Sequence, residues 1–214
     1  MLTIKRHVEP SAEQWDIIIE GTRNPLNSWD KSDSGWDTDG NYTVGERDYK
    51  LMLKLSRAGS DHAKFRRMIP ILVTITAPLY WWKEFDTYKV GTTANSCSTM
   101  HTIHKKPFTP DDFSDELLQG GSVDTLNDII DDLNFNRNMY LDTGVREFWD
   151  SIIQLLPTSY NQTRTVSLNY EVLRNIYFAR RNHKLSEWHT LCDWIRTLPY
   201  SEIITVERDT VCTT

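Results

Sequence analysis

The chain has 214 residues, of which 39% are hydrophobic, and a formal net charge of -6. This length and apolar content allow one domain with a sizeable core. The negative charge argues against general binding of nucleic acid or anionic membranes, because both require a basic surface. No apolar stretch has the pattern of a signal peptide or the length to span a bilayer, so we expect a cytoplasmic protein without membrane or nucleic-acid partners.

The cysteines are odd in number and widely spaced, at Cys97, Cys192 and Cys212. This spacing is typical of reduced thiols rather than of a disulfide framework. His101 and His104 follow Cys97, but no second cysteine or clustered carboxylate accompanies them. We therefore expect no metal site.

Two helices are predicted near the start of the chain. Ser11 and Gln14 form a capping-box pattern for a helix that we expect Gly21 to end. The second helix spans about residues 47–58, where hydrophobic residues recur at helical spacing, and Gly59 stops it.

The segment between these helices, residues 21–45, is rich in Asn, Ser, Asp and Gly and carries Trp29 and Trp36. Its composition indicates a loop, either an ordered surface loop or a lid. An interaction module that uses this loop to contact a partner is one open alternative for the whole protein.

The middle of the chain predicts a strand, a helix and a polar loop in succession. Residues 69–77 alternate as a half-buried strand does, and Pro78 opens a helix at its first position. Residues 79–85 are crowded with aromatics, whereas residues 86–104 show no clear period and many small hydroxyl side chains. This order of elements presents side chains to a cleft.

The acidic residues 109–136 predict short helices. Hydrophobic residues at three- and four-residue spacing then predict a core helix over residues 145–156, which Pro157 terminates. Residues 162–168 read as a short strand, and Asn169 is the expected N-cap of the helix that follows.

That helix carries an apolar stripe formed by Tyr170, Leu173, Ile176 and Tyr177. The next turn of the stripe falls on Arg180, where a core-facing position holds a permanent charge. Such a group needs an anionic or carbonyl-rich partner, and the alternative is a structural salt bridge. The last helix is expected to start with Ser186 as its cap and to stop at Pro199.

The C-terminal residues resemble the flavin-dependent thymidylate synthases, and more closely a divergent branch encoded by bacteria and their phages. The resemblance there is carried by Leu156, Pro157, Asn169, Leu173, Asn175 and Ile176, followed by Arg180 or Arg181. Upstream, it is carried by Asp61, His62 and Phe65, which are similar to the acid-histidine pair near the flavin, and by Ala77 and Pro78, which match the start of the cofactor-binding helix.

The resemblance implies an α+β fold with one mainly antiparallel sheet packed with several helices, as a single domain with a variable acidic segment at about residues 105–137. It also implies a homotetramer that binds FAD and methylates a uracil nucleotide, dUMP, with methylenetetrahydrofolate and NADPH.

The resemblance also assigns roles to individual residues. The catalytic residues would be Arg180, with Arg181 as the alternative, and His62. Cofactor binding would fall to His62, Lys89, Thr92, Asn95, Asn169 and Asn175. Substrate binding would fall to Glu84, Lys89, Ser98 and Arg180.

The sequence departs from the family's arginine-rich signature, which falls on Thr87, Tyr88, Lys89 and the residues after them, and only Lys89 keeps a positive charge. The family's phosphate-binding arginine falls on Ile153. Each charge-assisted hydrogen bond to phosphate is worth about 1.5–3 kcal/mol. These losses favour an alternative, a catalytically inactive protein of a phage or mobile element that binds or sequesters a nucleotide.

Overall fold

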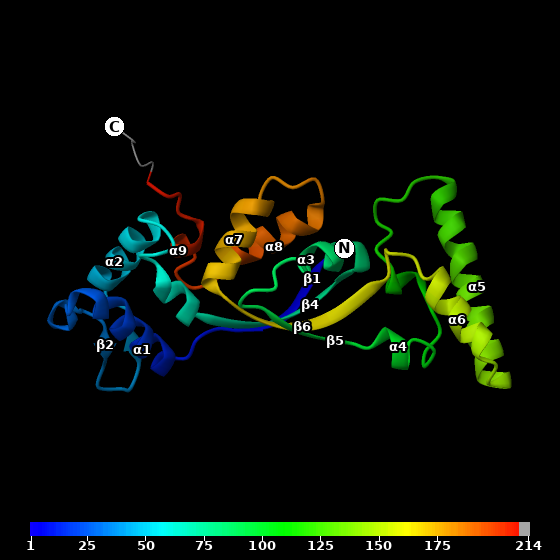
Figure 1. Cartoon of the computed structure of the whole chain (residues 1–214), viewed down its shortest axis with the longest axis horizontal. Helices are drawn as coiled ribbons and strands as arrows, with labels where there is room; N and C mark the ends of the chain where they lie inside the picture. Colours follow the sequence, from blue (N-terminus) through cyan, green and yellow to red (C-terminus); the bar gives the residue numbers. More distant parts are fainter. Residues whose placement is uncertain (210–214) are drawn as a thin grey trace. The chain divides into compact units, whose positions relative to one another are not determined.

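The structure is a computed structural model that describes residues 1–209 (Figure 1). The chain forms two compact units, each assembled from separate stretches of sequence. Unit 1 contains Met1–Thr3, Ile75–Thr87 and Asn95–Thr165. Unit 2 contains Ile4–Thr74, Tyr88–Ala94 and the chain from Val166 onward.

A four-stranded sheet has the order β1 (Thr3–Val8), β4 (Pro70–Pro78), β6 (Asn161–Asn169), β5 (Thr93–Ser96). Backbone hydrogen bonds show that β4 and β6 run antiparallel. Tyr170 donates to Ile69 at 3.1 Å, whereas Leu79 donates to Tyr160 at 3.0 Å. Both of these strands were predicted, and the structure confirms them.

Unit 2 contains most of the helices and the larger share of the buried aliphatic residues. Its helices are α1 (Ala12–Arg23), α2 (Glu46–Arg57), α7 (Tyr170–Arg180), α8 (Ser186–Arg196) and α9 (Glu202–Thr205). The predicted stripe of α7 is buried, with its four residues at most 6% exposed. The capping box at Ser11 and the predicted extent of α2 are confirmed as well.

The prediction that Gly21 ends the first helix is wrong, because α1 continues to Arg23. A Cβ at Gly21 would lie 2.9 Å from Cε of Met68, so this glycine makes room for a packed side chain. The predicted loop that follows is ordered. It holds the short 3-10 turns Asn24–Leu26 and Trp29–Lys31 and the hairpin of β2 (Gly35–Trp36) with β3 (Tyr42–Thr43).

Unit 1 contains α3 (Leu79–Phe85), α4 (Thr99–Thr102), α5 (Gly121–Thr143) and α6 (Arg146–Leu155). The prediction of short acidic helices is wrong, because α5 is one helix of 23 residues. Leu126, Ile130 and Leu133 keep one face of α5 buried, and no Pro or Gly interrupts the helix after its first residue. Gly144 ends it with a φ of 68°.

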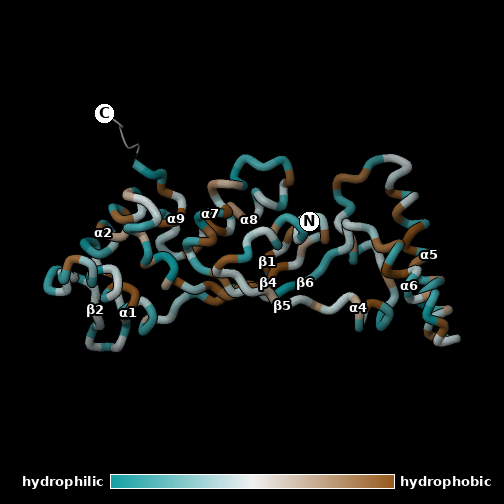
Figure 2. Tube along the Cα trace, viewed as in Figure 1, coloured by the Kyte–Doolittle hydropathy of each residue, from teal (hydrophilic) through white to brown (hydrophobic). Residues whose placement is uncertain are grey.

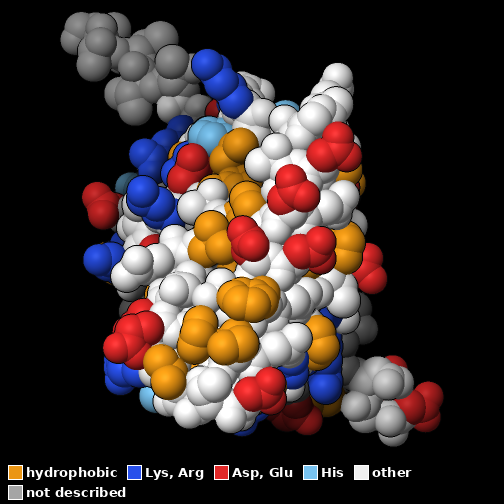
Figure 3. All heavy atoms as spheres, turned by 90° about the vertical axis from the view of Figure 1, so that its right-hand side faces the viewer, with side chains coloured by type: hydrophobic (Ala, Val, Ile, Leu, Met, Phe, Trp, Pro, Cys, Tyr) orange, Lys and Arg blue, Asp and Glu red, His pale blue; other side chains and the backbone are white. Residues whose placement is uncertain are grey.

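Helix α6 is less buried than its apolar pattern predicts, because Ile152 is its one fully buried residue and Val145 before it is exposed. The helix packs against α5, and hydrophobic and hydrophilic residues alternate along both helices (Figure 2). The face of unit 1 shown in Figure 3 therefore carries hydrophobic side chains among acidic ones. Phe135 and Leu141, 58% and 51% exposed, lie on α5.

Two predicted helix starts are wrong by one residue. Pro78 is the N-cap of α3 and the last residue of β4 rather than the first helical residue. Ser186 is the first residue of α8, and the extended Leu185 precedes it. The Trp188 N–H donates to the Leu185 carbonyl, so the backbone itself closes the first turn. Among residues 1–209, no helix has the length and apolar content needed to cross a membrane.

Candidate functional site

Helix α7 is fixed at its N-terminus by the predicted cap. The Asn169 side chain accepts hydrogen bonds from the backbone N–H groups of Glu171 and Val172, both at 3.1 Å. This confirms Asn169 as the N-cap and sets the rotation of the helix. Arg174 and Arg180 lie on α7 and Arg181 is its C-cap, and each makes its own set of contacts.

Arg174 is a structural arginine. It is 3% exposed, and its Nη1 donates to the carbonyls of Ile204 at 2.8 Å and Val206 at 2.5 Å. Burial and the nearby positive charges of Arg66 and Arg208 lower the pKa of Arg174 to about 10. Its donors therefore hold the chain that follows α9 against α7.

A buried ion pair also ties α7 to the 3-10 turn Lys64–Met68. Nε of Arg66 donates to Oε2 of Glu171 at 2.7 Å, and both residues are buried. Burial lowers the pKa of Arg66, and the carboxylate of Glu171 opposes that shift. The charge of Arg66 is thus paired inside unit 2.

Arg180 lies in a cluster of aromatic rings. Its Nε donates to the Tyr88 hydroxyl at 3.0 Å, and its guanidinium carbon lies 4.6 Å from the ring centre of Trp188 and 5.7 Å from that of Tyr88. The ring centres of His183 and Trp188 lie 6.3 Å apart, and the rings pack edge to face. We call these four residues the Arg180 cluster. Rings at these distances hold the guanidinium plane by cation-π attraction, while hydrogen bonds use its edge.

Arg181, the neighbouring residue, has a carboxylate partner. Its Nη1 donates to Glu207 at 2.7 Å, and this hydrogen bond raises the pKa of Arg181. Its guanidinium also lies 4.8 Å from the ring centre of Phe178. Both adjacent arginines thus contact aromatic rings, and the sequence alone left them as alternatives.

The segment Tyr88–Ala94 lies against α7 within unit 2. A Cβ at Gly91, which has a φ of 75°, would lie 3.2 Å from Val172 and 3.3 Å from Nδ2 of Asn169. Thr92 has a buried hydroxyl for which residues 1–209 supply no hydrogen-bond partner. Lys89 is exposed. The structure thus brings the segment with Lys89 and Thr92 against the N-cap of α7, and Tyr88 against Arg180.

The remaining predicted site residues are divided between the two units. His62 is exposed in a turn where its N–H donates to Gly59, and Asn175 is exposed on α7. Three others belong to unit 1. Glu84 is half-buried in α3, Asn95 is exposed in β5, and Ser98 caps α4 by accepting from the His101 N–H at 3.1 Å.

Sequence reasoning missed the aromatic partners of Arg180. Trp188 lies in the predicted last helix, and Tyr88 read as a departure from the family's signature. Two features of the sequence could have indicated this contact: the aromatic Tyr88 stands in the altered signature, and Arg180 continues a buried apolar stripe. The departure at Ile153 has a clear structural setting, because this side chain packs against the hydrophobic core of unit 1.

Thiols and metal ligands form no cluster in the described chain. Cys97 is exposed, Cys192 is buried, and burial raises the pKa of the Cys192 thiol to about 11. Cys212 lies outside the described residues. No group of three His, Cys, Asp or Glu side chains among residues 1–209 is placed to hold a metal ion.

The sheet and helices described above have the fold of the flavin-dependent thymidylate synthases, an α+β fold with a mainly antiparallel sheet. Thymidylate synthase X from Helicobacter pylori, solved with FAD and dUMP, is 16% identical over 94% of both chains with a TM-score of 0.67. The UMP/dUMP methylase PolB from Streptomyces cacaoi, bound with 5-Br dUMP, is 14% identical over 97% of this chain and 95% of that one, with a TM-score of 0.63.

The similarity extends along nearly the whole chain and concerns the fold. No protein-family model matches the chain, and no curated protein matches it in sequence. The resemblance inferred from Asn169, Leu173 and Arg180 is thereby confirmed at the level of the fold.

Proposed function

We propose that this protein is a flavin-dependent thymidylate synthase-like protein that binds FAD and a uracil nucleotide. The observation that carries the proposal is the Arg180 cluster at the end of a buried helix, on a fold shared with proteins solved with FAD and dUMP. A guanidinium presents parallel donors to a carbonyl-rich ring edge and keeps its charge at any physiological pH. Arg180 is therefore the residue we assign to the uracil ring.

The aromatic residues give Arg180 a fixed orientation. Trp188 is fully buried, and Tyr88 contacts the same guanidinium through both its hydroxyl and its ring. Holding a long side chain in place before the ligand arrives reduces the entropy lost on binding. The cluster would thus orient the uracil ring more strongly than a solvated arginine.

For the cofactor, the residues that fit are on the segment Tyr88–Ala94. Lys89 supplies a positive charge, and Thr92 supplies the buried hydroxyl that lacks a partner among residues 1–209. An ammonium group and a hydroxyl are suitable donors for a phosphate group of FAD. Asn169 would support the segment, because its Nδ2 lies 3.3 Å from where a Cβ at Gly91 would stand. The flavin, when bound, would supply the redox chemistry, and the protein would bind and orient the reactants.

Methylation of the nucleotide with methylenetetrahydrofolate and NADPH is the further step of the proposal. The second candidate is nucleotide binding without turnover. Ile153 favours it, because the family's phosphate-binding arginine falls on this partly buried residue, which packs against the core of unit 1. A homotetramer and a cytoplasmic location remain predictions, and light scattering of the purified protein would test the first.

The decisive experiment is a binding titration. The purified protein is incubated with FAD, its visible spectrum is recorded after gel filtration, and dUMP is then titrated while flavin fluorescence is followed. We expect a retained flavin spectrum and saturable dUMP binding. Replacing Arg180→Met should weaken dUMP at least about tenfold, since a hydrogen bond to a charged group contributes about 1.5–3 kcal/mol.

Arg181→Met is the matched control. It removes the same charge at the next residue, which is paired with Glu207. It should leave dUMP affinity within about twofold of the wild type, a difference of a few tenths of a kcal/mol. A colourless protein that takes up no FAD would refute cofactor binding, and equal losses in both variants would refute the assignment to Arg180. Formation of a 5-methyluracil nucleotide separates the enzyme from the inactive binder.

A further inference from the structure

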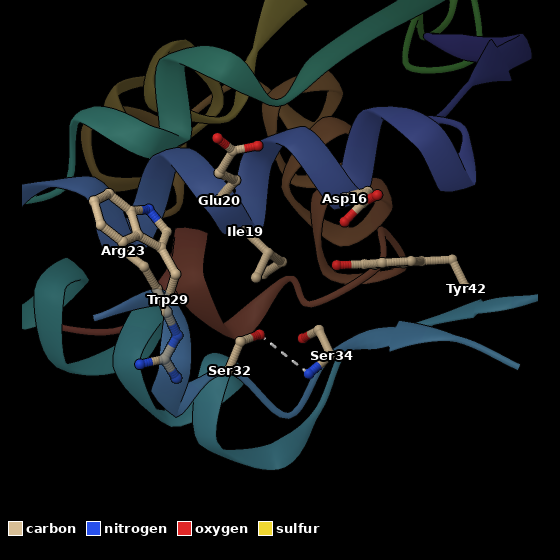
Figure 4. A pocket seen from close by; sticks show the side chains of 8 residues that line it. All are labelled: Asp16, Ile19, Glu20, Arg23, Trp29, Ser32, Ser34 and Tyr42. Atoms are coloured by element: carbon tan, nitrogen blue, oxygen red, sulfur yellow. Dashed lines mark hydrogen bonds between the residues drawn. The ribbon is translucent and has the colours of Figure 1, made fainter. Parts of the chain in front are cut away.

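Unit 2 has a pocket of about 200 Å³ between α1 and the loop that carries Trp29 (Figure 4). Its walls come from Ile19 and the acidic side chains of Asp16 and Glu20 on α1, and from Trp29, Ser34 and Tyr42 on the loop. Figure 4 shows Ile19 and the Tyr42 hydroxyl directed toward the centre of the space. At this volume the pocket suits a small ligand or one side chain rather than a drug-sized molecule.

The polar atoms of the pocket are mainly hydrogen-bond acceptors. The hydroxyls of Ser32 and Ser34 donate to Asp48 at 2.6 and 2.7 Å, so their protons are already committed. Each of these oxygens also accepts one backbone N–H, from Ser34 and Gly45 respectively. What each serine can still offer is an acceptor lone pair.

The aromatic N–H groups at the pocket are committed in the same way. The Trp29 indole donates to Asn24 at 2.8 Å, and the Trp36 indole donates to Asp16 at 3.0 Å. Trp29 is 50% exposed at the pocket wall, and Trp36 braces Tyr42 edge to face at 5.2 Å. The rings of Trp29 and Tyr42 therefore contribute apolar, electron-rich surface, and the Tyr42 hydroxyl is hydrogen-bonded to the side chains of Asp16 and Ser34.

The charge of the pocket is negative. Arg23, the one cation among the described residues that line it, is 5% exposed, and its Nε donates to Asp48 at 2.5 Å, so this charge is paired. Asp16 and Glu20 remain as exposed carboxylates one helical turn apart. Burial, followed by the charge of Asp16, raises the pKa of Tyr42 to about 12. Residues 24–45 add four aspartates against one lysine.

We propose that this pocket binds the ammonium or guanidinium group of an organic cation, presented by a free amine or by a lysine or arginine side chain of a peptide. Carboxylates and hydroxyl oxygens match the donors of such a group, and electron-rich rings attract its charge. An anion would meet repulsion from Asp16 and Glu20 and find few available donors. The pocket is separate from the Arg180 cluster and shares no residue with it.

Calorimetry with the full-length protein tests the proposal at low salt. The probes are N-acetyl-arginine amide, N-acetyl-lysine amide and 1,5-diaminopentane, and N-acetyl-citrulline amide is the neutral match for arginine. We expect the charged probes to bind and citrulline not to bind. Preference for the capped amino acids points to a peptide source, and preference for the diamine points to a free amine.

The double variant Asp16→Asn with Glu20→Gln removes both charges and keeps their shape. It should weaken the charged probes at least about tenfold, or about 1.4 kcal/mol. Asp131→Asn on the exposed face of α5 is the control and should leave the affinity unchanged. Trp29→Phe keeps a ring and should weaken binding less than Trp29→Ala. Absence of binding by every charged probe, equal binding of citrulline, or an unaffected double variant would each overturn the proposal.

Discussion

Replacing Asp48→Asn should destabilise unit 2 more than any surface change. The carboxylate is fully buried and accepts from Arg23 at 2.5 Å, from the hydroxyls of Ser32 and Ser34, and from the backbone N–H groups of Asp33 and Ser34. An amide keeps one oxygen but places an NH2 group among donors. Removing one partner of a buried ion pair costs about 3–5 kcal/mol, because the other charge stays buried.

The magnitude can be measured by urea denaturation at pH 7, followed by tryptophan fluorescence. A loss of about 3–5 kcal/mol is a large share of the 5–15 kcal/mol that stabilises a typical protein. At about 2–4 °C per kcal/mol for a chain of this size, Tm should fall by roughly 6–20 °C. The control Asp131→Asn is exposed and should stay within about 0.5 kcal/mol of the wild type.

The pH dependence of the same variant gives a second test. Burial raises the pKa of Asp48, but hydrogen bonds from Ser32, Ser34 and Arg23 outweigh it, so the net pKa is lowered. A lowered pKa in the folded state stabilises the protein above the unfolded value of about 3.9 and ceases to do so as pH falls through the folded value. The gap between wild type and Asp48→Asn should therefore shrink below about pH 4. A gap under about 1 kcal/mol at pH 7, or one that persists in acid, would refute the reasoning.

Two further substitutions test the elements around these sites. Asn169→Ala should cost about 0.5–2 kcal/mol in urea denaturation, because the N–H groups of Glu171 and Val172 lose their cap, and Asn169→Asp should restore most of it. Gly45→Ala should lower the thermal midpoint, since the new Cβ would lie 2.3 Å from the Asp33 carboxyl carbon and 2.4 Å from its backbone oxygen. Overpacking of this kind costs about 1–3 kcal/mol. Gly35→Ala is the control, because its Cβ would meet nothing within 4 Å.

Local sequence patterns correctly predicted the elements that depend on residues close together in the chain. The alternation in β4 and β6 and the cap at Asn169 all arise from residues a few positions apart, and the structure has them where expected. The prediction for the acidic region was wrong, because it relied on the charges and not on the buried face of the helix. Its charges suggested several short helices, whereas the buried face of Leu126, Ile130 and Leu133 extends one helix through them.

The sequence predicted where Arg180 lies but not which side chains surround it. The buried stripe located Arg180 correctly at the edge of the core, yet its partner Tyr88 lies 92 residues away. The ion pair of Arg66 with Glu171 spans 105 residues. No local pattern encodes such pairs, because only the folded chain brings them together.

The division of the chain into units has a consequence for how the protein can be taken apart. The boundaries after Thr3, Thr74, Ala94 and Thr165 fall inside β1, β4, β5 and β6 respectively. A fragment that isolates either unit would sever every strand of the four-stranded sheet and expose unpaired strand ends prone to aggregation. Loss of one unit by truncation or gene fission should thus be far less tolerated than insertions in surface turns such as that of the β2–β3 hairpin.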